Sequence, residues 1–182
     1  PTGLIAVIPP WNFPAAIPAG GILAGLASGA AVVVKPAPAA ARTAAIVVET
    51  LWQAGVPREV LQYVHLTDRE LMTRLACDQR VDRVVLTGSH DTAVALRRAR
   101  PDLAILAETS GKNAIIVTPH ADLDLAVRDV VASAFGHAGQ KCSAASLVIC
   151  VGSVATSKRF ARQLQDAVES LQVGTPDDLR TQ

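Results

Sequence analysis

Aromatic side chains are scarce in this chain, since Phe, Trp and Tyr together make up 3% of its 182 residues. Half of the residues are nevertheless hydrophobic, so the apolar content consists mainly of Ala, Val, Leu and Ile. Aliphatic residues in this proportion are typical of parallel sheets that helices cover on both faces. The length suits one ordinary domain or part of a larger protein.

Charge is absent from positions 1 to 34, and so long an uncharged run has to be considered as a membrane span. Asn12 and four prolines, at positions 9, 10, 14 and 18, interrupt this run. Its many Gly and Ala residues add little driving force for insertion, although glycines at 21, 25 and 29 resemble a small-residue packing face. We therefore predict no membrane span, and instead a strand, a loop, a small-residue helix packed closely on a sheet, and a second strand.

Cysteine is rare as well, and the three that occur, Cys77, Cys142 and Cys150, form no CxxC pattern. Neither a disulfide framework nor a metal site is indicated, which suits a reducing compartment, and we expect the cytoplasm. No secretory signal pattern opens the chain. The formal net charge is +1 and the basic residues are dispersed, which argues against a nucleic-acid partner.

Short apolar runs alternate with helical patterns along the chain. We predict strands at residues 4–8, 30–34, 60–64, 81–86, 103–107, 114–117 and 147–151, and helices at 15–27, 40–54, 68–76, 91–98, 122–135 and 154–171, with Asp68 and Asp122 as N-caps. This alternation predicts the α/β class, with a parallel sheet and flanking helices. Because the chain starts with Pro and has no closing element, we expect a segment truncated at both ends.

The stretch at residues 135–143 reads Phe-Gly-His-Ala-Gly-Gln-Lys-Cys-Ser and suggests a reactive thiol. Glycine lets the backbone approach a ligand closely, and the charge of Lys141 favours the thiolate form of Cys142. A thiolate is the form that attacks a carbonyl carbon. The alternative is a buried structural thiol, because free cysteine is among the most buried residue types.

Polar residues are expected at the carboxyl ends of several predicted strands, where open α/β sheets bind their ligands. Asn12 follows the first strand, Lys35 the second, Ser89 the strand ending at Leu86, and Glu108 the strand ending at position 107. Each alone has an ordinary interpretation, as a turn former, a solvated strand end or a helix cap. Together they predict a site at one sheet edge, but not an ordinary dinucleotide fingerprint, because GxGxxG is absent after the first strand.

Five motifs in order resemble the aldehyde dehydrogenase superfamily. They are Pro-Trp-Asn-Phe-Pro at residues 10–14, Lys-Pro at 35–36, Leu-Thr-Gly-Ser at 86–89, Glu-Thr-Ser-Gly-Lys at 108–112 and Gly-Gln-Lys-Cys at 139–142. Within the superfamily, the last two are most similar to 1-pyrroline-5-carboxylate dehydrogenases, which oxidise L-glutamate γ-semialdehyde. The resemblance implies a Rossmann-like fold, with residues 1–110 as a partial NAD(P)-binding domain and residues 111–182 as the N-terminal part of a catalytic domain.

The resemblance also implies a role for each motif residue. Cys142 is expected as the nucleophile, Asn12 as an oxyanion donor and Glu108 as the general base. Phe13 and Ser143 are expected to contact the substrate. The residues expected to bind the cofactor are Ile8, Trp11, Lys35, Gly88, Ser89 and Thr109.

The resemblance implies NAD as the cofactor. NADP is the alternative, because Pro38 stands where many members carry a glutamate that holds the adenosine ribose, and proline has no carboxylate to repel a 2′-phosphate. The resemblance further implies a small-molecule aldehyde substrate, a homo-oligomeric parent and a fusion to a proline dehydrogenase domain in some members. Two other classes stay open: a non-catalytic structural relative, and an acyl-transfer thiol enzyme. The second would need a base such as His137 beside Cys142.

Overall fold

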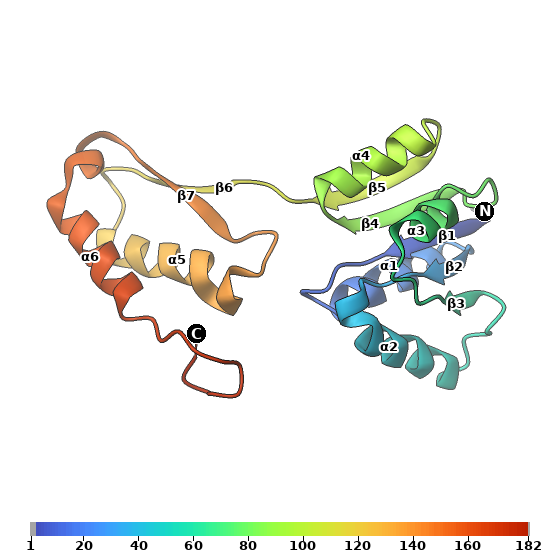
Figure 1. Cartoon of the computed structure of the whole chain (residues 1–182). Helices are drawn as coiled ribbons and strands as arrows, with labels where there is room; N and C mark the ends of the chain where they lie inside the picture. Colours follow the sequence, from blue (N-terminus) through green and yellow to red (C-terminus); the bar gives the residue numbers. More distant parts are fainter. Residues whose placement is uncertain (1–2, 182) are drawn as a thin grey trace. The chain divides into compact units, whose positions relative to one another are not determined.

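The computed structural model describes residues 3–181, and the chain divides into two compact units between Ser110 and Gly111 (Figure 1). Each unit has its own sheet, with two hydrophobic clusters in the first unit and one in the second. That the first unit binds a cofactor and the second opens a catalytic domain stays a prediction.

The first unit is a five-stranded parallel sheet with helices between its strands. The strands are β1 (Leu4–Ile8), β2 (Ala31–Val34), β3 (Leu61–Tyr63), β4 (Arg83–Gly88) and β5 (Ala104–Thr109), in the spatial order β3-β2-β1-β4-β5. The helices are α1 (Ala16–Ala27), α2 (Ala41–Gln53), α3 (Arg69–Ala76) and α4 (His90–Ala99), and the short helix η1 (Pro38–Ala40) precedes α2. The predicted α/β class, with a parallel sheet and flanking helices, is therefore confirmed.

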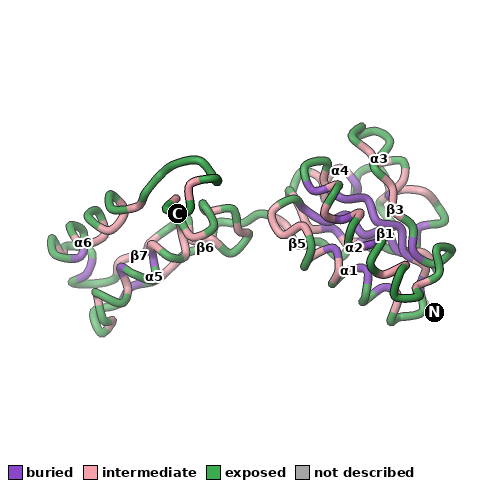
Figure 2. Tube along the Cα trace, turned by 90° about the horizontal axis from the view of Figure 1, so that it is seen from below, coloured by how far each residue is buried: buried purple, intermediate pink, exposed green. Residues whose placement is uncertain are grey.

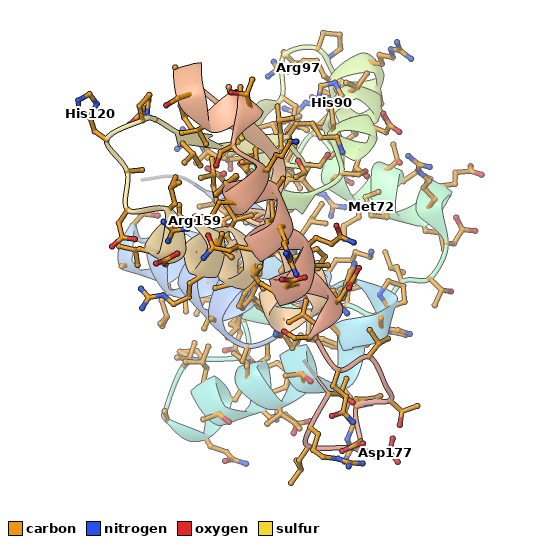
Figure 3. All side chains as sticks on the ribbon, turned by 90° about the vertical axis from the view of Figure 1, so that its left-hand side faces the viewer. Met72, His90, Arg97, His120, Arg159 and Asp177 are labelled. Atoms are coloured by element: carbon orange, nitrogen blue, oxygen red, sulfur yellow. The ribbon has the colours of Figure 1, made fainter. Side chains whose placement is uncertain are left out.

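Alternate side chains of the central strands enter two separate cores, one on each face of the sheet. Ala6 and Ile8 of β1 pack in a cluster that includes Met72 of α3 (labelled in Figure 3). Ile5 and Val7 of the same strand pack on the other face, with residues of α1 and α2. Figure 2 shows the buried residues concentrated along these strands, as expected for strands that are covered on both sides.

Helix α1 packs closely on the sheet, as its small residues predicted. A Cβ atom added to Gly21 would come 2.8 Å from Cγ1 of Val7, and one added to Gly25 would come 2.7 Å from Cγ2 of Val32. Neither position has room for a side chain, so the two glycines allow the helix to lie against β1 and β2.

The second unit consists of a two-stranded parallel sheet and two long helices. Its elements are β6 (Asn113–Val117), α5 (Leu123–Phe135), η2 (Gly136–Gly139), β7 (Ala145–Cys150), η3 (Gly152–Thr156) and α6 (Lys158–Glu169). Its core includes Val117, Val127, Val154 and Phe160. Arg159 of α6 (Figure 3) donates a hydrogen bond to Asp124 of α5 over 2.7 Å, which joins the two helices at the surface.

Several element boundaries differ from those predicted. Glu108 does not follow a strand, because β5 continues to Thr109 and pairs Glu108 with Thr87 of β4. The predicted helix over 154–171 is divided into η3 and α6, because the hydroxyl of Ser157 caps a new helix by accepting from the N–H of Phe160. The predicted caps Asp68 and Asp122 are confirmed.

No helix among residues 3–181 is both long and apolar enough to cross a membrane. The uncharged N-terminal run forms β1, α1 and β2 instead, as predicted.

Candidate functional site

The loops after β1 and β2 lie side by side at the carboxyl edge of the five-stranded sheet. The backbone N–H of Lys35 donates to the carbonyl oxygen of Val7 over 2.9 Å, and that of Ala37 donates to Pro9 over 3.2 Å. These two bonds extend the β1–β2 pairing beyond β2 itself. They position the segment that carries Asn12 and Phe13, both half-buried, next to the segment that carries Lys35.

Lys35 is the buried charged residue of this edge, with only 9% of its surface exposed. A solvated strand end was the ordinary interpretation of this lysine, and its burial contradicts that interpretation. Desolvation lowers the pKa of its ammonium group, because burial disfavours the charged form. A buried lysine beside an open sheet edge is suited to donate hydrogen bonds to a polar ligand.

The ends of β4 and β5 contribute Gly88, Ser89 and Thr109. Gly88 pairs with Thr109 in the last step of the ladder. The hydroxyl of Ser89 caps α4 by accepting from the N–H of Thr92 over 3.2 Å. A ligand at this point would therefore meet a helix N-terminus, where backbone N–H groups favour negative charge.

The remaining predicted residues of this edge differ in exposure. Ile8 is buried in the core at the end of β1, whereas Trp11 is 51% exposed. Glu108 is exposed on β5, so its carboxylate can reach solvent and a water molecule. The first unit thus brings Asn12, Lys35, Ser89 and Glu108 to the carboxyl ends of β1, β2, β4 and β5.

Cys142 lies in the second unit, in the turn between η2 and β7, and its side chain is exposed. Within the part of the protein that the structure describes, Cys142 is therefore not a buried thiol. Cys77 and Cys150 are both half-buried, and all three cysteines are free. Burial raises the pKa of the Cys77 thiol, which leaves less of it as thiolate near neutral pH. Ser143, next to Cys142, is exposed as well.

The side chains of Asn113 and Ser133 hold the Cys142 turn, and sequence reasoning assigned neither of them a role. The amide nitrogen of Asn113 donates to the carbonyl oxygen of Cys142 over 2.6 Å and to that of Ala144 over 3.1 Å. The hydroxyl of Ser133 on α5 accepts from the N–H of Ala145 over 3.2 Å. The available signal was a polar residue, Asn113, at the start of an apolar strand and directly after the motif at residues 108–112.

The turn before Cys142 has an uncommon backbone conformation. His137, Ala138 and Gly139 have φ angles of 60°, 53° and 69°, which is the left-handed region that only glycine enters without cost. A Cβ atom on Gly139 would come 3.0 Å from the carbonyl oxygen of Ala134. The positive φ angle and this close approach together explain the glycine at position 139. Backbone strain of this kind is concentrated at functional sites.

The residues at the carboxyl edge of the first unit fit a dinucleotide. Lys35 can donate to ribose oxygens, the N-terminus of α4 can face phosphate, and Gly88 leaves the chain open there, because the nearest atom to an added Cβ is 3.7 Å away. No group of three potential metal ligands occurs among residues 3–181.

Comparison with known proteins identifies the family. The sequence profile of the aldehyde dehydrogenase family matches residues 1–182, which is the whole chain. The chain belongs to the aldehyde dehydrogenase family. The family resemblance inferred from the five motifs is therefore confirmed.

This aldehyde dehydrogenase chain is 38% identical to a 1-pyrroline-5-carboxylate dehydrogenase of Geobacillus kaustophilus, over 100% of the chain and 36% of that protein. It is 35% identical to an N-succinylglutamate 5-semialdehyde dehydrogenase of Paraburkholderia xenovorans, over 96% of the chain and 36% of that protein. The structure of Proline Utilization A (PutA) from Corynebacterium freiburgense superposes with a TM-score of 0.92 at 51% identity, covering 100% of the chain and 18% of that protein. The chain thus spans about a third of the curated dehydrogenases it matches.

Proposed function

We propose that the complete natural protein containing this chain oxidises an aldehyde to a carboxylate with NAD. The observation that carries the proposal is the exposed thiol of Cys142 on a tethered turn, in a chain of the aldehyde dehydrogenase family. Residues 1–110 would bind the cofactor, and residues 111–182 would begin the catalytic domain. A non-catalytic relative would need neither an exposed thiol nor an edge built from Asn12, Lys35 and Glu108.

In this proposal Cys142 forms the covalent intermediate. Its thiolate attacks the aldehyde carbon and gives a tetrahedral oxyanion, which the Asn12 amide and the Cys142 backbone N–H stabilise. One such donor typically lowers the barrier by about 3 kcal/mol. Loss of the aldehyde hydrogen as hydride, for which the cofactor would be the acceptor, would convert this thiohemiacetal into a thioester on Cys142. Glu108 then takes a proton from water, whose oxygen attacks the thioester carbon, releases the carboxylic acid and restores the thiolate.

The cofactor would lie at the carboxyl edge of the first unit. Lys35 would donate to the adenosine ribose, Ser89 and Gly88 would face the phosphates, and Ile8, Trp11 and Thr109 would line the same edge. When bound there, NAD supplies the hydride acceptor for the oxidation of the thiohemiacetal. NADP stays the alternative, because Pro38 of η1 presents no carboxylate to repel a 2′-phosphate.

L-Glutamate γ-semialdehyde is the substrate we propose, in the catabolism of proline. Ser143 follows the nucleophile and is exposed, so its hydroxyl can donate to the α-carboxylate, and Phe13 can pack on the aliphatic part. The Geobacillus relative, named for the cyclic form of this aldehyde, supports this choice. The Paraburkholderia relative, named for a succinylated semialdehyde, supports the alternative of a related amino-acid semialdehyde.

The similarity to Proline Utilization A supports a parent that is fused to a proline dehydrogenase domain. We also propose a homo-oligomer, as the family resemblance implies. A cytoplasmic location is proposed because three free cysteines suit a reducing compartment.

Formation of NADH by the complete protein, measured with a panel of aldehydes, tests this function. We expect activity that Cys142→Ala abolishes and that Cys77→Ala, the matched control, leaves intact. Transfer of an acyl group without NADH would favour the acyl-transfer enzyme instead. No reaction of any aldehyde in a folded protein would favour the non-catalytic relative.

A further inference from the structure

The side chain of Asn113 joins strand β6 to the turn at residues 142–144, which carries Cys142. Its amide nitrogen carries two hydrogens, and the two bonds from it end on Cys142 and Ala144, 29 and 31 residues further along the chain. The side chain is half-buried, and the bonds are 2.6 Å and 3.1 Å long. One carboxamide therefore holds the backbone on both sides of Ser143.

The strand pairing is irregular at the same place. Asn113 pairs with Ala145 but Ala114 pairs with Leu147, so Ser146 is the extra residue of a bulge in β7. The hydroxyl of Ser146 reaches the backbone carbonyl of Asn113 over 3.5 Å. Bulges re-aim neighbouring side chains and end regular pairing. Here the bulge separates the pair Asn113–Ala145, next to the Cys142 turn, from the regular pairing of the rest of β6 and β7.

The bond to Cys142 constrains the atom that matters for catalysis. The carbonyl of Cys142 belongs to the peptide group that follows its Cα, so a bond to its oxygen restrains that peptide group and narrows the range of the ψ angle of Cys142. This angle sets the direction of the Cα–Cβ bond relative to the tethered peptide group, and that direction limits the positions that the sulfur can take by rotation about Cα–Cβ. The chain before Cys142 passes through left-handed angles at residues 137–139.

We propose that Asn113 is a positioning residue for the Cys142 nucleophile, and this inference rests on the proposed function of that thiol. Both of its side-chain bonds end on the turn, and it is not part of the buried core cluster of the second unit. Its loss should therefore change the behaviour of the thiol more than the stability of the unit. A small misplacement of reacting groups costs a large factor in rate.

Two variants of the complete protein test this role. Asn113→Asp keeps the shape but replaces the donor with an acceptor that faces two carbonyl oxygens, and Asn113→Ala removes the group. Ser146→Ala is the matched control, because it removes the neighbouring hydroxyl at the same bulge without touching Cys142. Alkylation by iodoacetamide, followed residue by residue with mass spectrometry, reads out the thiol directly, and Cys77 serves as the internal reference.

We expect both Asn113 variants to lower kcat by roughly ten- to a hundredfold, with little change in the KM for NAD. The alkylation rate of Cys142 should change severalfold relative to that of Cys77, while Ser146→Ala resembles the wild type in both respects. If Asn113→Asp does not fold, Asn113→Ala decides alone. Wild-type kcat and alkylation in Asn113→Ala, or a fall in kcat that only tracks the loss of folded protein, would overturn the inference.

The same experiment separates this inference from the proposed function. An inactive Cys142→Ala together with normal Asn113 variants would overturn the positioning role and leave the function intact. Full activity in Cys142→Ala would overturn the proposed function, and the positioning role with it.

Discussion

Val7 of β1 and Gly21 of α1 lie so close that a Cβ atom on the glycine would come 2.8 Å from Cγ1 of the valine. The valine cannot easily move away, because it is buried and its branched side chain has few rotamers. The loop that carries Asn12 leads directly from β1 into α1. Close packing of the helix on the strand therefore also determines where this loop lies.

Gly21→Ala should destabilise the first unit by about 1–3 kcal/mol through overpacking. Gly20→Ala is the matched control on the same helix, since a Cβ atom there meets nothing within 4 Å. Alanine at that exposed position should be neutral or stabilise the helix by up to about 1 kcal/mol. Urea denaturation of the two variants measures the difference, and equal midpoints would show that α1 does not need a glycine at position 21.

Lys35→Met should leave the protein at least as stable as the wild type at pH 7, because it removes the cost of burying an ammonium group. The pKa of Lys35 is lowered in the folded state, so the unfolded chain binds more protons in the window between that pKa and 10.5. Wild-type stability therefore rises with pH in this window. The difference in the free energy of unfolding between Lys35→Met and the wild type should therefore become smaller from pH 7 to pH 10.

NAD binding by the same variant should weaken roughly ten- to a hundredfold, as expected for the loss of a hydrogen bond from a charged donor. Isothermal titration of the complete protein measures this, with Lys158→Met, on an exposed lysine of α6, as the control for loss of one charge. Unchanged NAD affinity in Lys35→Met would remove this lysine from the cofactor site.

Cys142 should be the first cysteine to react with limiting iodoacetamide at pH 7–8. It is exposed, whereas Cys77 and Cys150 are half-buried and burial raises the pKa of Cys77. Raising the pH should narrow the difference, because Cys77 becomes thiolate only at higher pH. Peptide mapping by mass spectrometry reports the order. Earlier labelling of Cys77 or Cys150 would contradict the assignment of the nucleophile.

Ser143→Ala should weaken the use of L-glutamate γ-semialdehyde roughly ten- to a hundredfold in kcat/KM, because a charge-assisted hydrogen bond to the α-carboxylate is lost. Butanal, which has no carboxylate, should be oxidised as before. An equal loss for both aldehydes would mean that Ser143 only supports the turn. A wild-type preference for butanal would leave the aldehyde dehydrogenase assignment and remove the proposed substrate.

The strands of the first unit could be predicted well from the sequence, because a strand buried on both faces is an apolar run whose ends are marked by Pro, Gly or charge. Val33 and Val34 lead straight to Lys35 and Pro36, and β2 ends there. The end of β5 could not be predicted in this way. Its extension to Glu108 and Thr109 comes from pairing with Thr87 and Gly88 on a neighbouring strand.

In the candidate site, too, some residues could be predicted from the sequence and others could not. Asn12, Lys35, Glu108 and Cys142 could be proposed from the sequence, because each has a chemical group that the motif needs, and their roles stay predictions. Asn113 could not be assigned a role, since its two bonds reach residues far along the chain. The left-handed backbone conformation of His137 and Ala138 could not be predicted from the sequence either, because histidine and alanine do not favour left-handed angles locally.

Covalent capture on Cys142 tests the central claim most directly. Glu108→Gln, made in the complete protein, should still form the thioester but hydrolyse it slowly. After mixing with NAD and butanal, acid quenching and digestion, we expect a butanoyl group on the peptide that carries Cys142, and none when NAD is left out. NADH formation without any acyl group on Cys142, or an acyl group on another cysteine, would contradict the account.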